Sequence, residues 1–231
     1  MIVGRRFLQV IIVCLLVVGN TDSYAANLGL GAKIGTLGYG LEVTTGLNNK
    51  LNARLGINFF NYQANQTEES IDYKANLKLN SIAALLDWHP TGGGFRFTGG
   101  MFINNNKLEL AASGQNDYEI GNDTYTGNLQ VNGTVGFLQT APYFGLGWGK
   151  APSKTGHWGL GIDLGVLYQG APHVNLNASG TATRQSDGLV IDVTNDPTFR
   201  ADLLNEEDKL QHDLKDFKFY PVLSLGIIYK F

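Results

Sequence analysis

The segment from Tyr220 to Phe231 constrains the fold most, because its side chains alternate strictly along the chain. Counting back from the last residue, every second side chain is large and apolar: Phe231, Tyr229, Ile227, Leu225 and Leu223. The residues between them are mostly smaller or polar: Lys230, Ile228, Gly226, Ser224 and Val222. A period of two puts the two sets on opposite faces of a β-strand. The sequence therefore predicts a strand with one fully apolar face, which indicates a membrane-crossing strand.

The N-terminal segment predicts export from the cytoplasm. Residues 1–25 have the pattern of a signal peptide: Arg5 and Arg6, then an apolar run over residues 7–18, then the small-x-small sequence at residues 23–25. This run is shorter than the roughly 20 residues of a spanning helix. We therefore expect a signal peptide at 1–25 and a mature domain at 26–231.

Composition limits what the mature chain can be. The sequence contains one cysteine, Cys14, and it lies within the expected signal peptide. Neither a disulfide nor a thiolate metal site is therefore predicted in the mature domain. The formal net charge of −3 gives no footprint for nucleic acid. No segment after the signal is apolar enough for a transmembrane helix, and the chain contains 30 glycines. A membrane protein of this kind must satisfy its backbone hydrogen bonds between strands, which requires a closed barrel.

Alternating segments recur along the chain and predict about eight crossing strands. The clearest runs from Trp158 to Tyr168, with an aromatic residue at each end of its apolar face. The expected turns at 48–50, 89–94 and 150–156 are short, whereas the connections at 63–72, 105–140 and 170–219 are long. We predict an all-β, antiparallel up-and-down transmembrane barrel with long extracellular loops, strands that protrude beyond the membrane, and one short amphipathic helix at about 197–217 before the last strand.

If the apolar faces meet lipid, the opposite faces predict a set of charged residues in the lumen. These are Lys33, Glu42, Arg54, Lys74, Lys78, Arg96 and Asp163. Most are basic, so one interpretation is a lumen that favours anionic solutes. The other is structural, because an eight-stranded barrel is just wide enough for side chains to fill, and buried charges need partners. Glu42 and Arg54 face each other across the hairpin at 48–50 and are the expected ion pair.

No catalytic, cofactor or metal site is predicted. The histidines, His89, His157, His173 and His212, are scattered without ligand spacing, and none has a serine two residues later. A catalytic triad assembled from distant residues stays open as an alternative. The alternating glycines lack the following helix of a phosphate loop, and we interpret them as space for long inward side chains, with a wider cavity as the alternative.

The C-terminal pattern of Leu225, Ile227, Tyr229 and Phe231 resembles the signature of bacterial outer-membrane β-barrel proteins. That resemblance implies recognition by the barrel-assembly machinery, secretion through the inner membrane, and integration in the outer membrane among lipid and lipopolysaccharide. In strand count and loop asymmetry the mature chain is similar to the small OmpW-like and OmpA-like barrels. The similarity implies a porin-like barrel that passes or binds small molecules of unknown identity. The alternative is a closed structural or adhesive barrel that acts through its extracellular loops.

Overall fold

The computed structural model describes residues 28–68, 71–149 and 157–230. Eight of its strands form a closed antiparallel ring. In order around the barrel they are β1 (Leu28–Gly35), β2 (Gly38–Asn48), β3 (Leu51–Glu68), β4 (Ile71–Trp88), β5 (Phe95–Asn104), β8 (Thr140–Gly149), β9 (Trp158–Tyr168) and β12 (Phe219–Lys230). The ring closes because β12 pairs with β1 and β4 pairs with β5. The predicted eight-stranded barrel is therefore confirmed. Within the described residues, no helix is both long enough and apolar enough to cross a membrane.

The barrel wall is apolar outside, as the alternation predicts. On β9 the outward Leu160 and Leu164 are 70% and 52% exposed, whereas Asp163 between them is buried. Aromatic side chains gather at both ends of the wall. Trp88, Trp148 and Trp158 lie at the end that holds the β2–β3 and β4–β5 turns, and Tyr39, Phe59, Tyr168 and Phe219 lie at the other. The eleven residues of β9, at about 3.3 Å each and a usual tilt of about 40°, give an apolar band roughly 25 Å tall.

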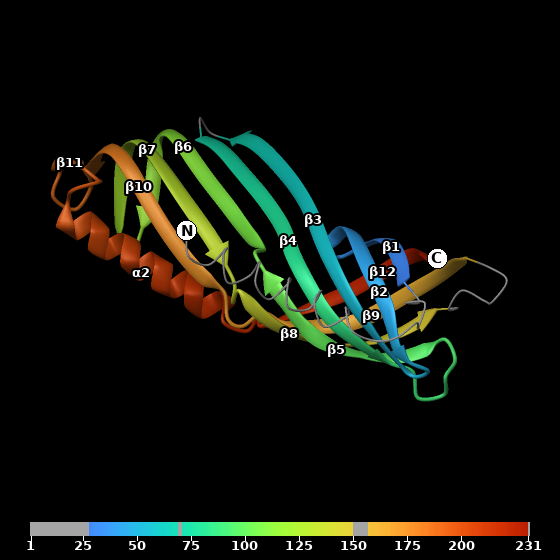
Figure 1. Cartoon of the computed structure of the whole chain (residues 1–231). Coiled ribbons are helices and arrows are strands. Elements are labelled where there is room, and N and C mark those ends of the chain that lie inside the picture. Colours follow the sequence, from blue (N-terminus) through green and yellow to red (C-terminus); the bar gives the residue numbers. More distant parts are fainter. Residues whose placement is uncertain (1–27, 69–70, 150–156, 231) are drawn as a thin grey trace.

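Four further strands extend the barrel wall at the end opposite the β2–β3 and β4–β5 turns (Figure 1). They are β6 (Lys107–Ile120), β7 (Asp123–Gly136), β10 (His173–Arg184) and β11 (Val190–Asp192). Strand β4 is shared, because residues 81–88 pair with β5 in the barrel whereas residues 71–78 pair with β6. We call the part of the sheet beyond the barrel, from β3 and β4 to β11, the extension.

The extension corrects one expected loop and confirms the strands expected to protrude. In the predicted loop at 63–72, residues 63–68 continue β3 and residues 71–72 begin β4. The long connections at 105–140 and 170–219 contain β6, β7, β10 and β11, which are the protruding strands. These strands lack the apolar outward face that identified the barrel strands, because Gln63, Asn65 and Thr67 lie above the apolar band. The predicted turn at 89–94 is confirmed. The turn at 150–156, the signal peptide and Phe231 lie outside the described residues.

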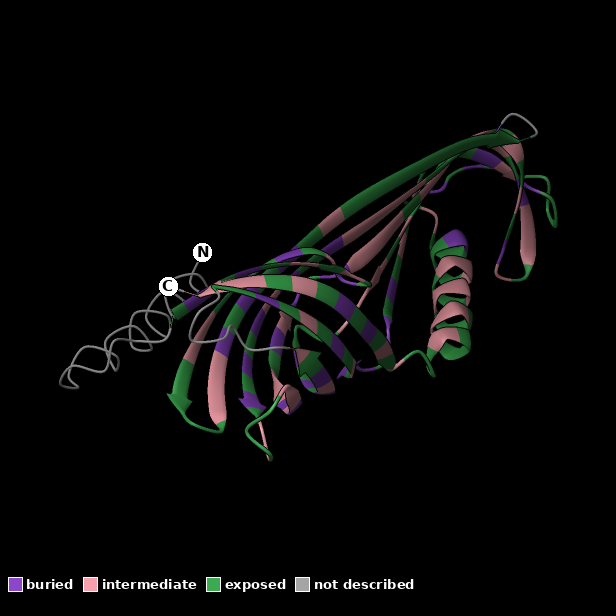
Figure 2. Ribbon diagram, turned by 90° about the vertical axis from the view of Figure 1, so that its right-hand side faces the viewer, coloured by how far each residue is buried: buried purple, intermediate pink, exposed green. Residues whose placement is uncertain are grey.

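The predicted amphipathic helix is α2 (Pro197–Leu214), which packs against β10 beside the extension (Figure 2). Asp196 caps its N-terminus by accepting a hydrogen bond from the Phe199 amide at 2.8 Å, and Pro197 suits the first turn. Phe199 is 1% exposed and packs in a small core at the tip of the extension. That core is formed by Ile120, Tyr125, Leu129, Ala182, Ile191, Val193 and Phe199.

Helix α2 also covers the free edge of β10. The Val174 and Leu176 amides donate hydrogen bonds to Gln211 and Glu207 of the helix, at 3.3 and 3.0 Å. The Tyr125 hydroxyl donates to Asp202 at 2.6 Å, and burial together with this bond raises the pKa of Tyr125 above its ordinary value. An uncovered strand edge would pair with other chains, so the helix protects the extension from aggregation.

Candidate functional site

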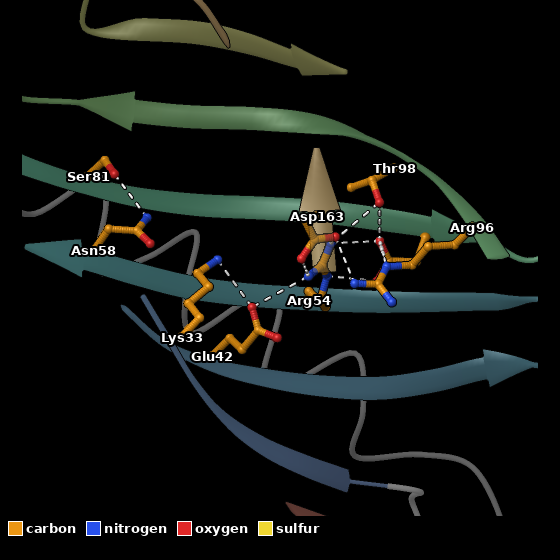
Figure 3. Close-up of polar contacts among 9 residues, drawn as sticks. Lys33, Glu42, Arg54, Asn58, Ser81, Arg96, Thr98 and Asp163 are labelled. Atoms are coloured by element: carbon orange, nitrogen blue, oxygen red, sulfur yellow. Dashed lines mark hydrogen bonds and ion pairs between the residues drawn. The ribbon is translucent and has the colours of Figure 1, made fainter. Parts of the chain in front are cut away.

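The barrel lumen contains a buried network of charged side chains centred on Arg54 of β3 (Figure 3). Its Nε lies 2.7 Å from Asp87 Oδ2, and its Nη1 lies 3.1 Å from Asp163 Oδ2 and 3.5 Å from Glu42 Oε2. Arg54 is 3% exposed, so its guanidinium depends on these carboxylates rather than on water. One arginine thus joins side chains from strands β2, β4 and β9.

Two further cations complete the network. Arg96 Nη2 lies 2.7 Å from Asp163 Oδ1, and Lys33 Nζ lies 3.2 Å from Glu42 Oε2. The Thr98 hydroxyl donates to Asp87 at 2.7 Å. Three basic side chains therefore face three carboxylates, and the network is neutral overall. A neutral network gives the lumen no preference for anions. The arrangement matches the structural interpretation, in which the charges pair with one another in a narrow barrel.

Sequence reasoning missed Asp87, which contacts both arginines of the network. The second half of β4 is apolar on both faces, so its pattern alone did not assign an inward set. The available signal was a lone carboxylate between Leu86 and Trp88, both of which are half exposed on the outer face. An acid in such a stretch needs a buried cation, and in the observed register of β3 and β4 that cation is Arg54.

A second layer of the lumen is apolar and lies toward the extension. It is formed by Leu37, Ala83, Leu85, Phe102, Ala141, Tyr143, Leu167 and Val222. The Tyr143 ring crosses the inner surface of the wall at Gly145 and Gly165, where a side chain would overlap its hydroxyl. Between the apolar layer and the Arg54 network lies a cavity of about 20 Å³, room for a single water molecule. Successive levels of the lumen are thus filled.

The turn end of the lumen is open by comparison. A vestibule of about 250 Å³ there ends on Arg54, Asp87 and Arg96. Its walls include Asn52, His89 and Lys230. Glycines give the network its space, since a Cβ at Gly147 would lie 2.5 Å from Arg96 Nε. The alternating glycines were expected to make room either for long inward side chains or for a wider cavity. At Gly147 the space is occupied by a long inward side chain, that of Arg96.

Two of the seven residues predicted in the lumen lie elsewhere. The structure places Lys33, Glu42, Arg54, Arg96 and Asp163 inside the barrel. Lys74 and Lys78 instead lie in the extension, on the same side of β4 as the outward-facing Leu86 and Trp88. The error arose because the alternation was not followed unbroken through β4, whose pairing with β3 shows no register shift from residue 71 to residue 88.

The residues of the expected assembly signal lie on β12, which closes the barrel between β1 and β9. Leu225 and Ile227 are exposed on the outer face, and the Tyr229 ring packs edge-on against Trp158 with ring centroids 5.0 Å apart. Recognition of these side chains by the assembly machinery stays a prediction. Among the described residues, no group of three or more histidine, cysteine and acidic side chains is arranged to hold a metal ion.

Comparisons with known proteins agree with this architecture. No family model and no curated protein matches the chain. Among solved structures, Acinetobacter baumannii CarO2 superposes with a TM-score of 0.57 at 20% identity, over 90% of this chain and 100% of that one. Acinetobacter baumannii CarO superposes with a TM-score of 0.55 at 22% identity, over 89% and 98%. A major outer membrane protein from Thermus thermophilus has a TM-score of 0.48 at 12% identity, over 90% and 100%. By its fold, the chain is a small eight-stranded β-barrel of the outer-membrane type.

Proposed function

We propose that this protein is an integral outer-membrane barrel with a closed lumen that acts through its extension. The membrane placement is supported by the apolar band and by the aromatic belts that border it at both ends. Exposed Leu160, Leu164 and Leu225 would be costly in water, whereas the hydrocarbon core of an outer membrane accommodates such a band. Small bacterial barrels keep their short turns and termini in the periplasm, so the extension projects from the cell.

The observation that carries the closed lumen is the Arg54 network stacked on the apolar layer. A solute that crossed the barrel would have to displace Phe102 and Tyr143 and separate Arg54 from its carboxylates. Removing one partner of a buried ion pair costs about 3–5 kcal/mol, so spontaneous opening is rare. The barrel is therefore an anchor, and the extension is the surface that meets other molecules.

The test of the closed lumen is conductance through planar bilayers that contain the refolded mature protein. We expect no steady single-channel current from the natural sequence, with a folded state verified by the heat-dependent shift in gel mobility. The double variant Arg54→Ala, Phe102→Ala removes material from both layers and is the positive comparison. A stable current from the natural protein would overturn the proposal and favour a porin-like channel.

Orientation has a separate test, because the mature chain contains no cysteine. Ser179→Cys puts a thiol on the exposed side of β10, and Asn49→Cys puts one on the exposed β2–β3 turn. A membrane-impermeant maleimide should label the first variant in intact cells and the second only after the outer membrane is broken. The reverse pattern would place the extension in the periplasm.

A second candidate function rests on the vestibule. A pocket of about 250 Å³ lined by Arg96, Asn52 and Lys230 is large enough and polar enough to bind a small polar solute from the turn side. This form of the porin-like hypothesis predicts that saturating solute raises the melting temperature of the natural protein, and that Arg96→Gln abolishes the rise. No rise with any member of a panel of small polar solutes would remove this candidate.

A further inference from the structure

One face of the extension is polar from edge to edge. Cross-strand pairing sets its side chains in rows, and the row nearest the barrel contains Asn61, Lys78, Lys107, Gly136 and His173. The second row contains Gln63, Asn76, Glu109, Thr134 and Asn175. The third contains Asn65, Lys74, Ala111, Asn132 and Asn177. We call these three rows the polar face.

The polar face continues the outer surface of the barrel wall. Strands β3 and β4 pair without a register shift from residue 51 to residue 88, so Asn61 and Lys78 point to the same side as Phe59 and Leu86. Phe59 belongs to the aromatic belt and pairs with Asn80, one row below Lys78. Two residues along a strand span about 6.6 Å. The first row thus lies at the depth where lipid headgroups begin.

The lysines of the polar face outnumber its acids. Lys78 and Lys107 are direct cross-strand neighbours, and Glu109 lies 2.6 Å from both ammonium groups. Like charges placed opposite each other destabilise a sheet, and one carboxylate neutralises only one of the two lysines. Lys74 is exposed three rows above the belt and has no ion pair among the described residues. This surface therefore keeps an excess positive charge that an anion at headgroup depth would neutralise.

The rest of the polar face presents amides rather than charges. Its second and third rows contain six asparagine or glutamine side chains, and the Asn76 side-chain oxygen has no hydrogen-bond partner among the described residues. Amide side chains both donate and accept hydrogen bonds, so they match the hydroxyl groups of sugars. The amides extend farther from the membrane than the first lysine row.

We propose that the polar face binds the headgroup of a phosphorylated glycolipid of the outer leaflet, lipopolysaccharide. Phosphate groups lie against Lys74, Lys78 and Lys107, and the attached sugars lie along the amide rows. A phospholipid headgroup reaches the lysines but leaves the amides unused, which is why the glycolipid is the better match. This inference rests on the proposed placement of the extension outside the cell.

The test uses the full mature protein in detergent micelles and purified lipopolysaccharide as the probe. The triple variant Lys74→Gln, Lys78→Gln, Lys107→Gln removes the charges of the polar face. The matched control is Lys50→Gln, Lys209→Gln, Lys215→Gln, which makes the same charge change at the turn end, on α2 and at the C-terminal cap of α2. With the charge excess removed, we expect the triple variant to bind at least about tenfold more weakly, and the control to bind like the natural protein.

Two additional probes identify the headgroup. Enzymatically dephosphorylated lipopolysaccharide should bind the natural protein about as weakly as intact lipopolysaccharide binds the triple variant. Phosphatidylglycerol, dispersed in the same detergent micelles, should bind less tightly than lipopolysaccharide. Equal binding of the triple variant and the control would overturn the proposal, and so would phosphatidylglycerol binding as tight as that of the glycolipid. Reversed maleimide labelling in cells contradicts only the proposed orientation, which separates the two failures.

Discussion

At the scale of single residues, Arg54 decides what the lumen is. Its guanidinium contacts three carboxylates from three strands, so it links opposite sides of the barrel across the interior. Such a network contributes little net stability relative to a well-packed apolar core, because desolvating its charges offsets their attraction. Once the network has formed, however, the loss of any one charged side chain leaves its partners buried without a counter-charge.

Replacement of Arg54 is therefore expected to be costly. Arg54→Ala leaves the three carboxylates of the network, Glu42, Asp87 and Asp163, with Lys33 and Arg96 as its two remaining cations. We expect the free energy of unfolding, measured by urea titration in lipid vesicles, to fall by about 3–5 kcal/mol. The control is Arg200→Ala, which removes an exposed arginine from α2 and should change the free energy by less than about 0.5 kcal/mol. Equal effects of the two substitutions would mean that the network is not intact in the membrane.

At the scale of elements, α2 completes the extension by covering the free edge of β10. Its Glu207 and Gln211 satisfy amides along the edge of β10, while β11 pairs with residues 181–183 of the same strand. The helix is held by the tip core and by its Asp196 cap, which also lies 2.9 Å from Arg184. None of these contacts involves the lumen, so the extension can loosen without opening the barrel.

The tip core gives a test of this independence. Phe199→Ala removes a fully buried ring that packs edge-on against Tyr125, with centroids 4.8 Å apart. A loss of about 3–5 kcal/mol is expected, confined to the extension. Limited proteolysis should cut the variant between residues 172 and 218 while the barrel fragment keeps its heat-dependent gel mobility. Leu204→Ala, at an exposed position of the same helix, should be cut like the natural protein. Simultaneous loss of both parts would show a single cooperative unit.

At the scale of the whole molecule, the barrel and the extension share one continuous sheet. The outward side of that sheet changes from apolar in the barrel to polar in the extension, and the change occurs within one row of Phe59. A bilayer positions the molecule by this boundary and by the opposite aromatic belt. The height of the protein in the membrane is thus fixed by its surface alone.

The three tryptophans make this placement measurable. Trp88, Trp148 and Trp158 are the only tryptophans of the chain, and all lie exposed at the turn end of the barrel. In vesicles of brominated phosphatidylcholine, bromine atoms near the glycerol should quench their fluorescence more strongly than bromine atoms near the acyl terminus, because aromatic belts sit at the interface. The natural protein unfolded in urea outside the vesicles is the control without lipid contact. Strongest quenching from the bilayer centre would contradict the proposed position.

Local pattern was sufficient for the barrel strands and for the inward direction of Glu42, Arg54 and Asp163. A strand that crosses a membrane must alternate, since one face meets lipid and the other meets the lumen. The sequence likewise predicted helix α2 from its cap, its proline and its apolar stripe. These features depend on neighbours in the chain, so they can be recognised without the fold.

The tertiary structure alone decided how β4 divides its pairing between β5 and β6, and that division moved Lys74 and Lys78 from the lumen to the polar face. It also brought Asp87 to Arg54 and filled the lumen with Phe102 and Tyr143. The physical reason is that pairing and filling are contacts between residues far apart in the chain. Alternation determines which side of a strand a residue occupies, but only the closed barrel determines what that side faces.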